Sequence, residues 1–148
     1  MWEFNKGVTA ENQAKDILKS IFSNVTRTKY GTFYDYLVKQ GNLSIRIEVK
    51  YCEIKYQSVS MVLKWKQFWR LIESKEFLIY LMTNKGNVFI SPKQLFNFAH
   101  VHHYQRNFDL KTIRLRVIMK NGKLKIIEPE KCNPSLCEGT IKKWLKNY

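Results

Sequence analysis

The sequence contains no apolar run of the roughly 18 residues that a membrane-spanning helix requires. The first residues, Met1–Lys6, lack the apolar core and cleavage site of a secretory signal. Only three cysteines occur, too few for a disulfide framework, and an odd number in a chain without a signal favours reduced thiols. No stretch rich in Pro, Gly or Ser divides the chain. These absences predict a single domain of 148 residues, intracellular and cytoplasmic, with no membrane partner.

Acidic residues are also scarce. Twelve Asp and Glu face 26 Lys and Arg, which gives a formal net charge of +14. Such a charge attracts polyanions, of which nucleic acid is the commonest. The basic residues are spread along the whole chain and no basic amphipathic helix dominates, which argues against an anionic membrane. We therefore expect a nucleic-acid partner, the alternative being a merely basic surface.

Hydrophobic periodicity predicts an α/β fold in which helices pack on a mixed sheet. The first helix is expected over Thr9–Ser23, with Thr9 as its cap and an apolar stripe that Glu11 extends. A carboxylate on a core-facing stripe needs a partner, because burying a lone charge is costly. Strands are expected at Val25–Tyr30, Thr32–Lys39, Leu43–Cys52, Phe77–Met82, Val88–Ser91, Thr112–Lys120 and Lys123–Glu128, and further helices at Leu63–Ser74, Lys93–His100 and Thr140–Asn147.

One predicted hairpin brings two carboxylates together. If residues 41–42 form its loop, Gln40 pairs with Leu43 and the same register places Asp35 opposite Glu48. Directly opposed residues point to the same face of a sheet, with Cβ atoms about 5 Å apart. Two such carboxylates repel each other unless a cation lies between them.

The residue types at this position suit a hard divalent cation. Oxygen ligands such as Asp35 and Glu48 favour Mg²⁺, with Mn²⁺ as a possible substitute, and Glu11 could supply a third carboxylate if its helix packs over this face. Lys50 shares the face of Glu48 and could stabilise charge in a transition state. This combination predicts hydrolysis of a phosphodiester bond.

An ordinary surface hairpin is the alternative. In that case Asp35 and Glu48 are solvated, and Glu48 pairs with Lys50 or Arg46. A Glu-x-Lys triplet alone is very common, so the prediction depends on its conjunction with Glu11 and the basic charge.

Three runs, Lys6–Glu11, Tyr34–Tyr36 and Ile47–Lys50, resemble the motifs of the PD-(D/E)XK nuclease superfamily. The resemblance covers residues 6 to about 98, including a helix with Gln67, and departs from the motif where Tyr34 replaces a common proline. It implies a restriction-endonuclease-like core and an Mg²⁺-dependent endonuclease that acts on double-stranded DNA. It also implies four catalytic residues, Glu11, Asp35, Glu48 and Lys50, of which the three carboxylates would bind the metal.

Two groups within that superfamily are similar to this chain. Small intron-encoded homing endonucleases match its size and basic character, with residues 99–148 as a C-terminal extension. Archaeal Holliday junction resolvases share the motif layout, but their Ser/Gly-rich segment before the motif Asp is short here. Both groups work as homo-oligomers, so we expect a homodimer or homotetramer and favour the site-specific endonuclease. A non-catalytic DNA-binding protein and an RNA-processing endonuclease remain alternatives.

Basic residues outside the motif are candidates for DNA contacts. Arg27, Lys29 and Arg46 could bind phosphates near the site. The hairpin at residues 112–128 could enter a major groove as a basic ribbon, or could simply be a solvated face. Its candidate DNA-binding residues are Arg114, Arg116, Lys123 and Lys125.

Two further groups of residues, a set of histidines and cysteines and an aromatic stripe, have simpler explanations than a binding site. The histidines at 100, 102 and 103 with Cys132 and Cys137 could bind zinc, but a DNA-facing or plain loop fits the spacing better. Trp65, Phe68 and Trp69 form a stripe that predicts core or subunit interface rather than a base-stacking platform.

Overall fold

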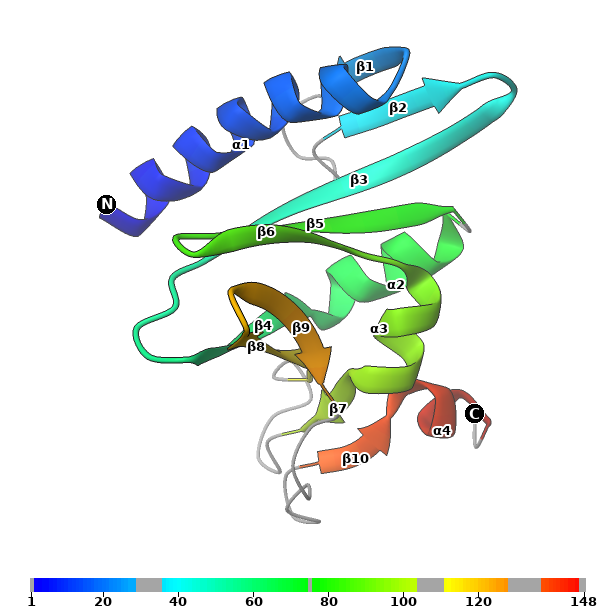
Figure 1. Cartoon of the computed structure of the whole chain (residues 1–148). Helices are drawn as coiled ribbons and strands as arrows, with labels where there is room; N and C mark the ends of the chain where they lie inside the picture. The colour runs from blue at the N-terminus through cyan, green and yellow to red at the C-terminus, as the bar shows by residue number, and fades with distance from the viewer. Residues whose placement is uncertain (1, 29–35, 75, 104–110, 128–136, 147–148) are drawn as a thin grey trace.

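A computed structural model of the chain describes residues 2–28, 36–74, 76–103, 111–127 and 137–146. For residues 2–11, 137–138, 144 and 146 it describes the backbone alone. The described residues form a mixed α/β fold with two sheets and four helices (Figure 1). None of these helices combines the length and the apolarity needed to span a membrane.

The first sheet has the strand order β1-β2-β3-β5-β6. Its central pair, β3 and β5, is parallel, and the other pairs are antiparallel. The continuous apolar run of β5 follows from its position, because both faces of a central strand are covered. The bounds are β1 Asn24–Arg27, β2 Tyr36–Gln40, β3 Leu43–Cys52, β5 Phe77–Thr83 and β6 Gly86–Ile90.

The second sheet is antiparallel and has the order β10-β7-β8-β4, with β9 also paired to β8. The β8–β9 turn is Asn121-Gly122, and both residues have positive φ, as a type I′ hairpin turn requires. The bounds are β4 Ser58–Lys64, β7 His100–His102, β8 Thr112–Lys120, β9 Lys123–Ile127 and β10 Cys137–Thr140.

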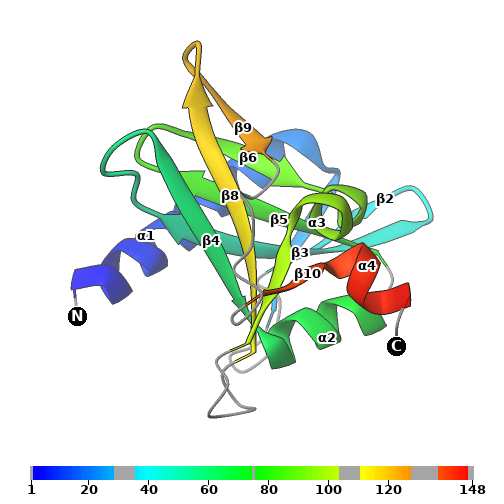
Figure 2. The same cartoon turned by 90° about the horizontal axis from the view of Figure 1, so that it is seen from below.

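The helices and the second sheet cover the two faces of the first sheet. Helix α1 (Trp2–Ile21) lies along one face, and its Ala14 and Leu18 pack with Ile47 and Val49 of β3. Helices α2 (Trp65–Glu73) and α3 (Pro92–Phe98) lie on the other face together with the second sheet (Figures 1 and 2). Helix α4 (Ile141–Lys146) closes the described chain beside α3. The larger hydrophobic core therefore joins both sheets.

The expected helix at Thr9–Ser23 is wrong at its start. Helix α1 begins at Trp2, so Thr9 is not a cap and Glu11 lies in the middle of the helix rather than in its first turn. Thr9 is a good capping residue type, but the helix continues on its N-terminal side even though Asn5 and Gly7 there are weak helix formers.

The expectation of one mixed sheet is also incomplete, because strands β4, β7 and β10 were not anticipated. Strand β4 alternates well, with Met61 and Leu63 buried, but it runs directly into α2 without a break in the chain. The hairpin at residues 112–127 pairs with β4 and shares a core with β5. Residues 99–148 are therefore not a simple appendage, since their strands complete the second sheet.

Candidate active site

Glu48 is a buried carboxylate in the middle of β3, with 5% of its surface exposed. Alternation along β3 turns it away from α1 and towards the face that α2 covers. Its parallel neighbour on β5 is Ile79, which belongs to the larger hydrophobic core. A charge in such surroundings requires polar partners. The alternative is therefore wrong in placing Glu48 in solvent, although the pairing of Glu48 with Lys50 that it expected is present.

Gln67 and Lys50 are among the side chains that meet the Glu48 carboxylate. The Gln67 amide donates a hydrogen bond from Nε2 to Oε1. The Lys50 Nζ lies 3.8 Å from the same oxygen, and 27% of the Lys50 side chain is exposed. The carboxylate is thus held by an amide, and the Lys50 side chain beside it is partly exposed.

The position of Gln67 depends on the packing of α2. Its neighbour Phe68 is fully buried and Leu71 follows one turn later, so Gln67 lies next to the buried stripe of the helix. Trp65 and Trp69 pack around Phe68 with ring centroids 5.5 and 5.9 Å away, which makes the aromatic stripe part of the core. A base-stacking role for this stripe is therefore disfavoured.

Gln67 is a site residue to which sequence reasoning gave no role. The available signal was a polar amide beside the apolar stripe of a helix, where an unpaired polar group would be costly. The sequence gives no indication that its partner is Glu48, because the two lie 19 residues apart and on different elements.

The predicted hairpin register is confirmed over the described residues. Gln40 pairs with Leu43, and the ladder continues outward until Tyr36 pairs with Ile47. One further step of the same register would bring position 35 opposite Glu48. Asp35 itself lies outside the described residues, and its role stays a prediction.

Helix α1 does not pack over the face that carries Glu48. Ala14 and Leu18 bring the helix against the opposite face, beside Ile47 and Val49. This differs from the packing under which Glu11 would supply a third carboxylate. The Glu11 side chain lies outside the described part of the chain, so its assignment as a ligand stays a prediction.

The donor type of the described site fits a hard divalent cation. Glu48 offers a carboxylate oxygen, which Mg²⁺ and Mn²⁺ prefer to nitrogen or sulfur. Among the described residues, no three His, Cys, Asp or Glu side chains cluster closely enough to hold a metal ion. The described site thus contributes one carboxylate, and its predicted co-ligands are Asp35 and Glu11.

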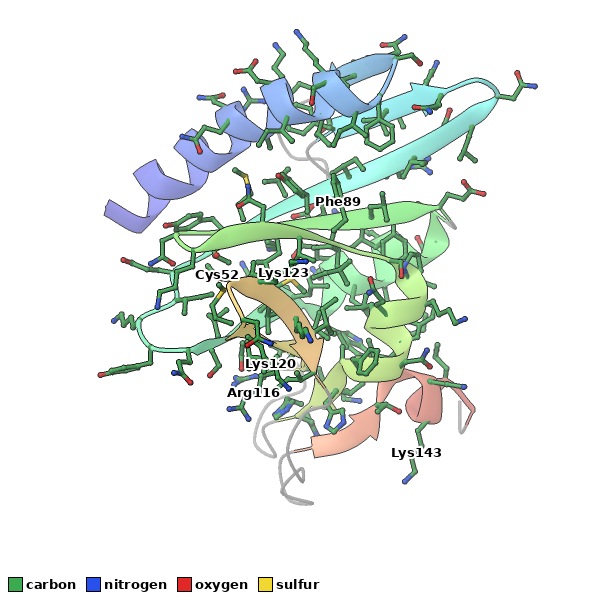
Figure 3. The ribbon with its side chains drawn as sticks, in the orientation of Figure 1. Cys52, Phe89, Arg116, Lys120, Lys123 and Lys143 are labelled. Carbon is green, nitrogen blue, oxygen red and sulfur yellow. The ribbon has the colours of Figure 1, made fainter. Side chains whose placement is uncertain are left out.

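Cys52, which is labelled in Figure 3, lies two residues after Lys50 on β3, so side-chain alternation places both on the same face. Burial raises the pKa of the Cys52 thiol above its ordinary value of 9.0, although the Lys50 charge opposes that shift. The thiol is therefore protonated at neutral pH, and Cys52 is not suited to act as a nucleophile.

The basic residues expected near the site have different surroundings. Arg46 is half-buried, and its Nη1 donates to the Ser74 carbonyl 3.1 Å away, just after α2 ends. This contact favours a structural role for Arg46 at the helix terminus. Arg27 is exposed on β1, with Nη1 3.5 Å from the Asn12 Oδ1. Lys29 lies outside the described residues.

The second sheet has a cationic outer face. Residues of β8 alternate between the buried core and this face, which carries Arg114 and Arg116. Lys123 and Lys125 lie on the neighbouring β9 and are exposed. No Asp or Glu occurs in β4, β7, β8 or β9. The predicted basic ribbon is therefore flanked by strands without acidic residues, and the acidic residue of this sheet, Glu138, lies on its edge strand β10.

The candidate zinc residues are split between strands. His100 and His102 lie on β7, and the backbone of Cys137 is paired with His102. Cys132 lies outside the described residues, as do residues 104–106 of the proposed DNA-facing loop. His102 has a pKa below its ordinary value because of burial first, then the charges of Arg114 and His100. These positive neighbours disfavour a cation at this position.

The lowered pKa of His102 predicts a loss of stability in acid. As the pH falls through 6.5, the ordinary value, the unfolded chain binds a proton that folded His102 resists. The contribution is therefore complete above that pH and is lost as the pH decreases towards the folded pKa. We expect His102→Gln to lose less stability than the wild type between pH 7.5 and pH 5.5, as measured by urea unfolding. An equal loss in both proteins would contradict this role of His102.

Comparisons of the chain with protein families, with curated proteins and with solved structures found no significant match to any of them.

Proposed function

We propose that this protein is a metal-dependent DNA endonuclease with a restriction-endonuclease-like core. The observation that carries the proposal is the buried Glu48 carboxylate, which accepts a hydrogen bond from Gln67 and lies 3.8 Å from the Lys50 ammonium. A buried acid beside a partly exposed base is an unusual and costly arrangement for a basic surface alone. It is an ordinary arrangement for a site that acts on a phosphodiester.

The order of elements supports the same proposal. Helix α1 is followed by the antiparallel strands β1, β2 and β3, and β5 then returns parallel to β3 after α2. The Glu-x-Lys triplet lies on β3, at the centre of this sheet. If the register of β2 and β3 continues one residue beyond Tyr36, it brings Asp35, the second predicted carboxylate, opposite Glu48.

The residues would divide the chemistry among them. Glu48, with Asp35 as its predicted partner, would hold the cation. Glu11 was predicted as a third ligand on the condition that α1 packs over the same face, and the described part of α1 packs over the opposite one. When bound, Mg²⁺ would offset phosphate charge and lower the pKa of the attacking water. Lys50 would stabilise negative charge that develops on the phosphate or help to orient that water. Gln67 would keep the Glu48 carboxylate in one orientation.

The net charge of +14 supports a nucleic-acid substrate, and the cationic second sheet would bind its backbone. We propose duplex DNA, cut at specific sites by paired subunits that each cleave one strand. A Holliday junction resolvase is the second candidate, based on the motif layout.

Cleavage assays test this proposal. We expect the protein to cut duplex DNA in Mg²⁺ or Mn²⁺ and to be inactive in EDTA. The substrates are a four-way junction, a plasmid with many potential sites, linear duplex and single-stranded DNA, and an RNA duplex at equal salt. Cleavage of the junction alone would identify the resolvase, and preference for RNA would identify an RNA-processing enzyme. Absence of cleavage with every divalent ion would leave a DNA-binding module.

A further inference from the structure

An open groove of about 700 Å³ lies between the loop that follows β3 and the outer face of the second sheet. It is separate from the Glu48 site, which lies in the interior of the first sheet. Three segments that are distant in sequence form it: the β3–β4 loop, the β5–β6 turn and strand β8. Its lining includes Tyr56, Lys85, Arg116, Ile118 and Met119.

The loop that carries Tyr56 is held on both sides. The Asn84 side chain accepts a hydrogen bond from the Ile54 N–H at 2.8 Å and donates one to the Ile54 carbonyl at 3.1 Å. On the other side, the Met119 N–H donates to the Gln57 carbonyl at 2.8 Å. The loop is thus tied to both sheets, which fixes the backbone on both sides of Tyr56.

Tyr56 itself points outward. Its exposed fraction is 83%, the largest among the exposed large hydrophobic residues of the described chain. The Lys85 Nζ donates to the Tyr56 carbonyl at 2.7 Å, which places the Lys85 ammonium beside the backbone of Tyr56. An exposed aromatic ring on a fixed loop offers a flat face at little entropic cost.

The charge of the groove identifies the chemistry of its ligand. Lys85 and Arg116 line it, and no Asp or Glu belongs to its lining. Lys120 and Lys123 extend the positive charge along the paired β8 and β9 (Figure 3). A groove that combines cations with an exposed aromatic face matches a nucleotide, which combines a phosphate with a planar base.

We infer that this groove binds a nucleotide of unpaired, single-stranded nucleic acid, with the base stacked on Tyr56 and the phosphate beside Lys85 and Arg116. An unpaired strand is favoured over a duplex because stacking on a side chain requires a base that is already free of its own stack. Binding in this groove is a function in addition to the proposed nuclease activity, since it does not involve Glu48. It gives the protein a means to recognise DNA with a single-stranded segment.

Binding assays in EDTA test the groove without cleavage. Fluorescence anisotropy would compare a labelled single-stranded DNA oligonucleotide with the duplex of the same sequence. We expect Tyr56→Ala to weaken single-strand binding about 10-fold while duplex binding changes less than about 2-fold, and Tyr56→Trp to restore binding. Leu43→Ala is the matched control. Leu43 is also an exposed apolar residue, but it lies at the first residue of β3, at the far end of that strand from the loop that carries Tyr56.

The phosphate contact has its own test. Lys85→Ala should make the slope of log affinity against log salt concentration shallower, by about the amount that one phosphate contact contributes. Lys143→Ala on α4 should leave that slope unchanged (Figure 3). Thermal unfolding confirms that each variant is folded. Unchanged single-strand binding in Tyr56→Ala, or equal weakening of single strand and duplex, would overturn the inference. The groove does not include Glu48 and binding is measured in EDTA, so a failure of the nuclease proposal leaves this result unaffected.

Discussion

Replacing Glu48 with Gln is expected to reduce DNA cleavage by about 10³-fold or more, a loss typical of removing a central catalytic group. The substitution keeps the volume of the side chain and an oxygen that can still accept the Gln67 hydrogen bond. It removes the negative charge, on which both cation binding and the Lys50 ion pair depend. Cleavage of a labelled duplex in Mg²⁺, measured under single-turnover conditions, gives the rate.

The control for this variant is Glu73→Gln, which removes the same charge from an exposed position near the end of α2. It should cleave like the wild type. Lys50→Ala should lower the rate by about 10²-fold or more while DNA binding persists. Cleavage by Glu48→Gln at the wild-type rate would refute the catalytic assignment, since unfolding cannot explain retained activity.

Phe68→Ala is expected to cost about 3–5 kcal/mol of folding free energy, the range for truncating a fully buried aromatic. Phe68 is 0% exposed and belongs to the core that joins α2 to both sheets. Its removal leaves a cavity beside Trp65 and Trp69, whose rings both pack against Phe68. Urea unfolding monitored by tryptophan fluorescence measures the change in midpoint, and an unchanged slope shows that the same surface is exposed.

Val62→Ala provides the comparison for Phe68→Ala. Val62 lies on β4, whose buried residues share a core with Phe68, but Val62 itself is 39% exposed. We expect it to change stability by about 0.5 kcal/mol or less. A loss in Phe68→Ala no larger than this would mean that α2 does not anchor the two sheets. Gln67 would then also lack the support that directs it towards Glu48.

Local patterns were sufficient to predict the hairpins. Strand β3 has the bounds expected from its alternation, and the tight turn at 41–42 sets its register with β2. The Asn121-Gly122 pair likewise marks the β8–β9 turn and the end of β8. These features depend on neighbours a few residues apart, for which turn geometry and period-two alternation are strong constraints.

The missed strands had weaker local signals. Strand β4 has alternation of its own, but its end coincides with the start of α2, so its pattern merges with that of the helix. The three-residue β7 and the four-residue β10 are too short for periodicity to detect. Their formation depends on pairing with β8 and with each other.

By itself the sequence determined which residues share the face of Glu48, the register of the hairpin and the excess of positive charge. Only the tertiary structure decided that this face is buried, that Gln67 meets Glu48 and that α1 covers the opposite face. The difference has a physical cause. Side-chain alternation is a property of one strand, whereas burial depends on which distant elements pack against it, and that choice is made by the whole core at once.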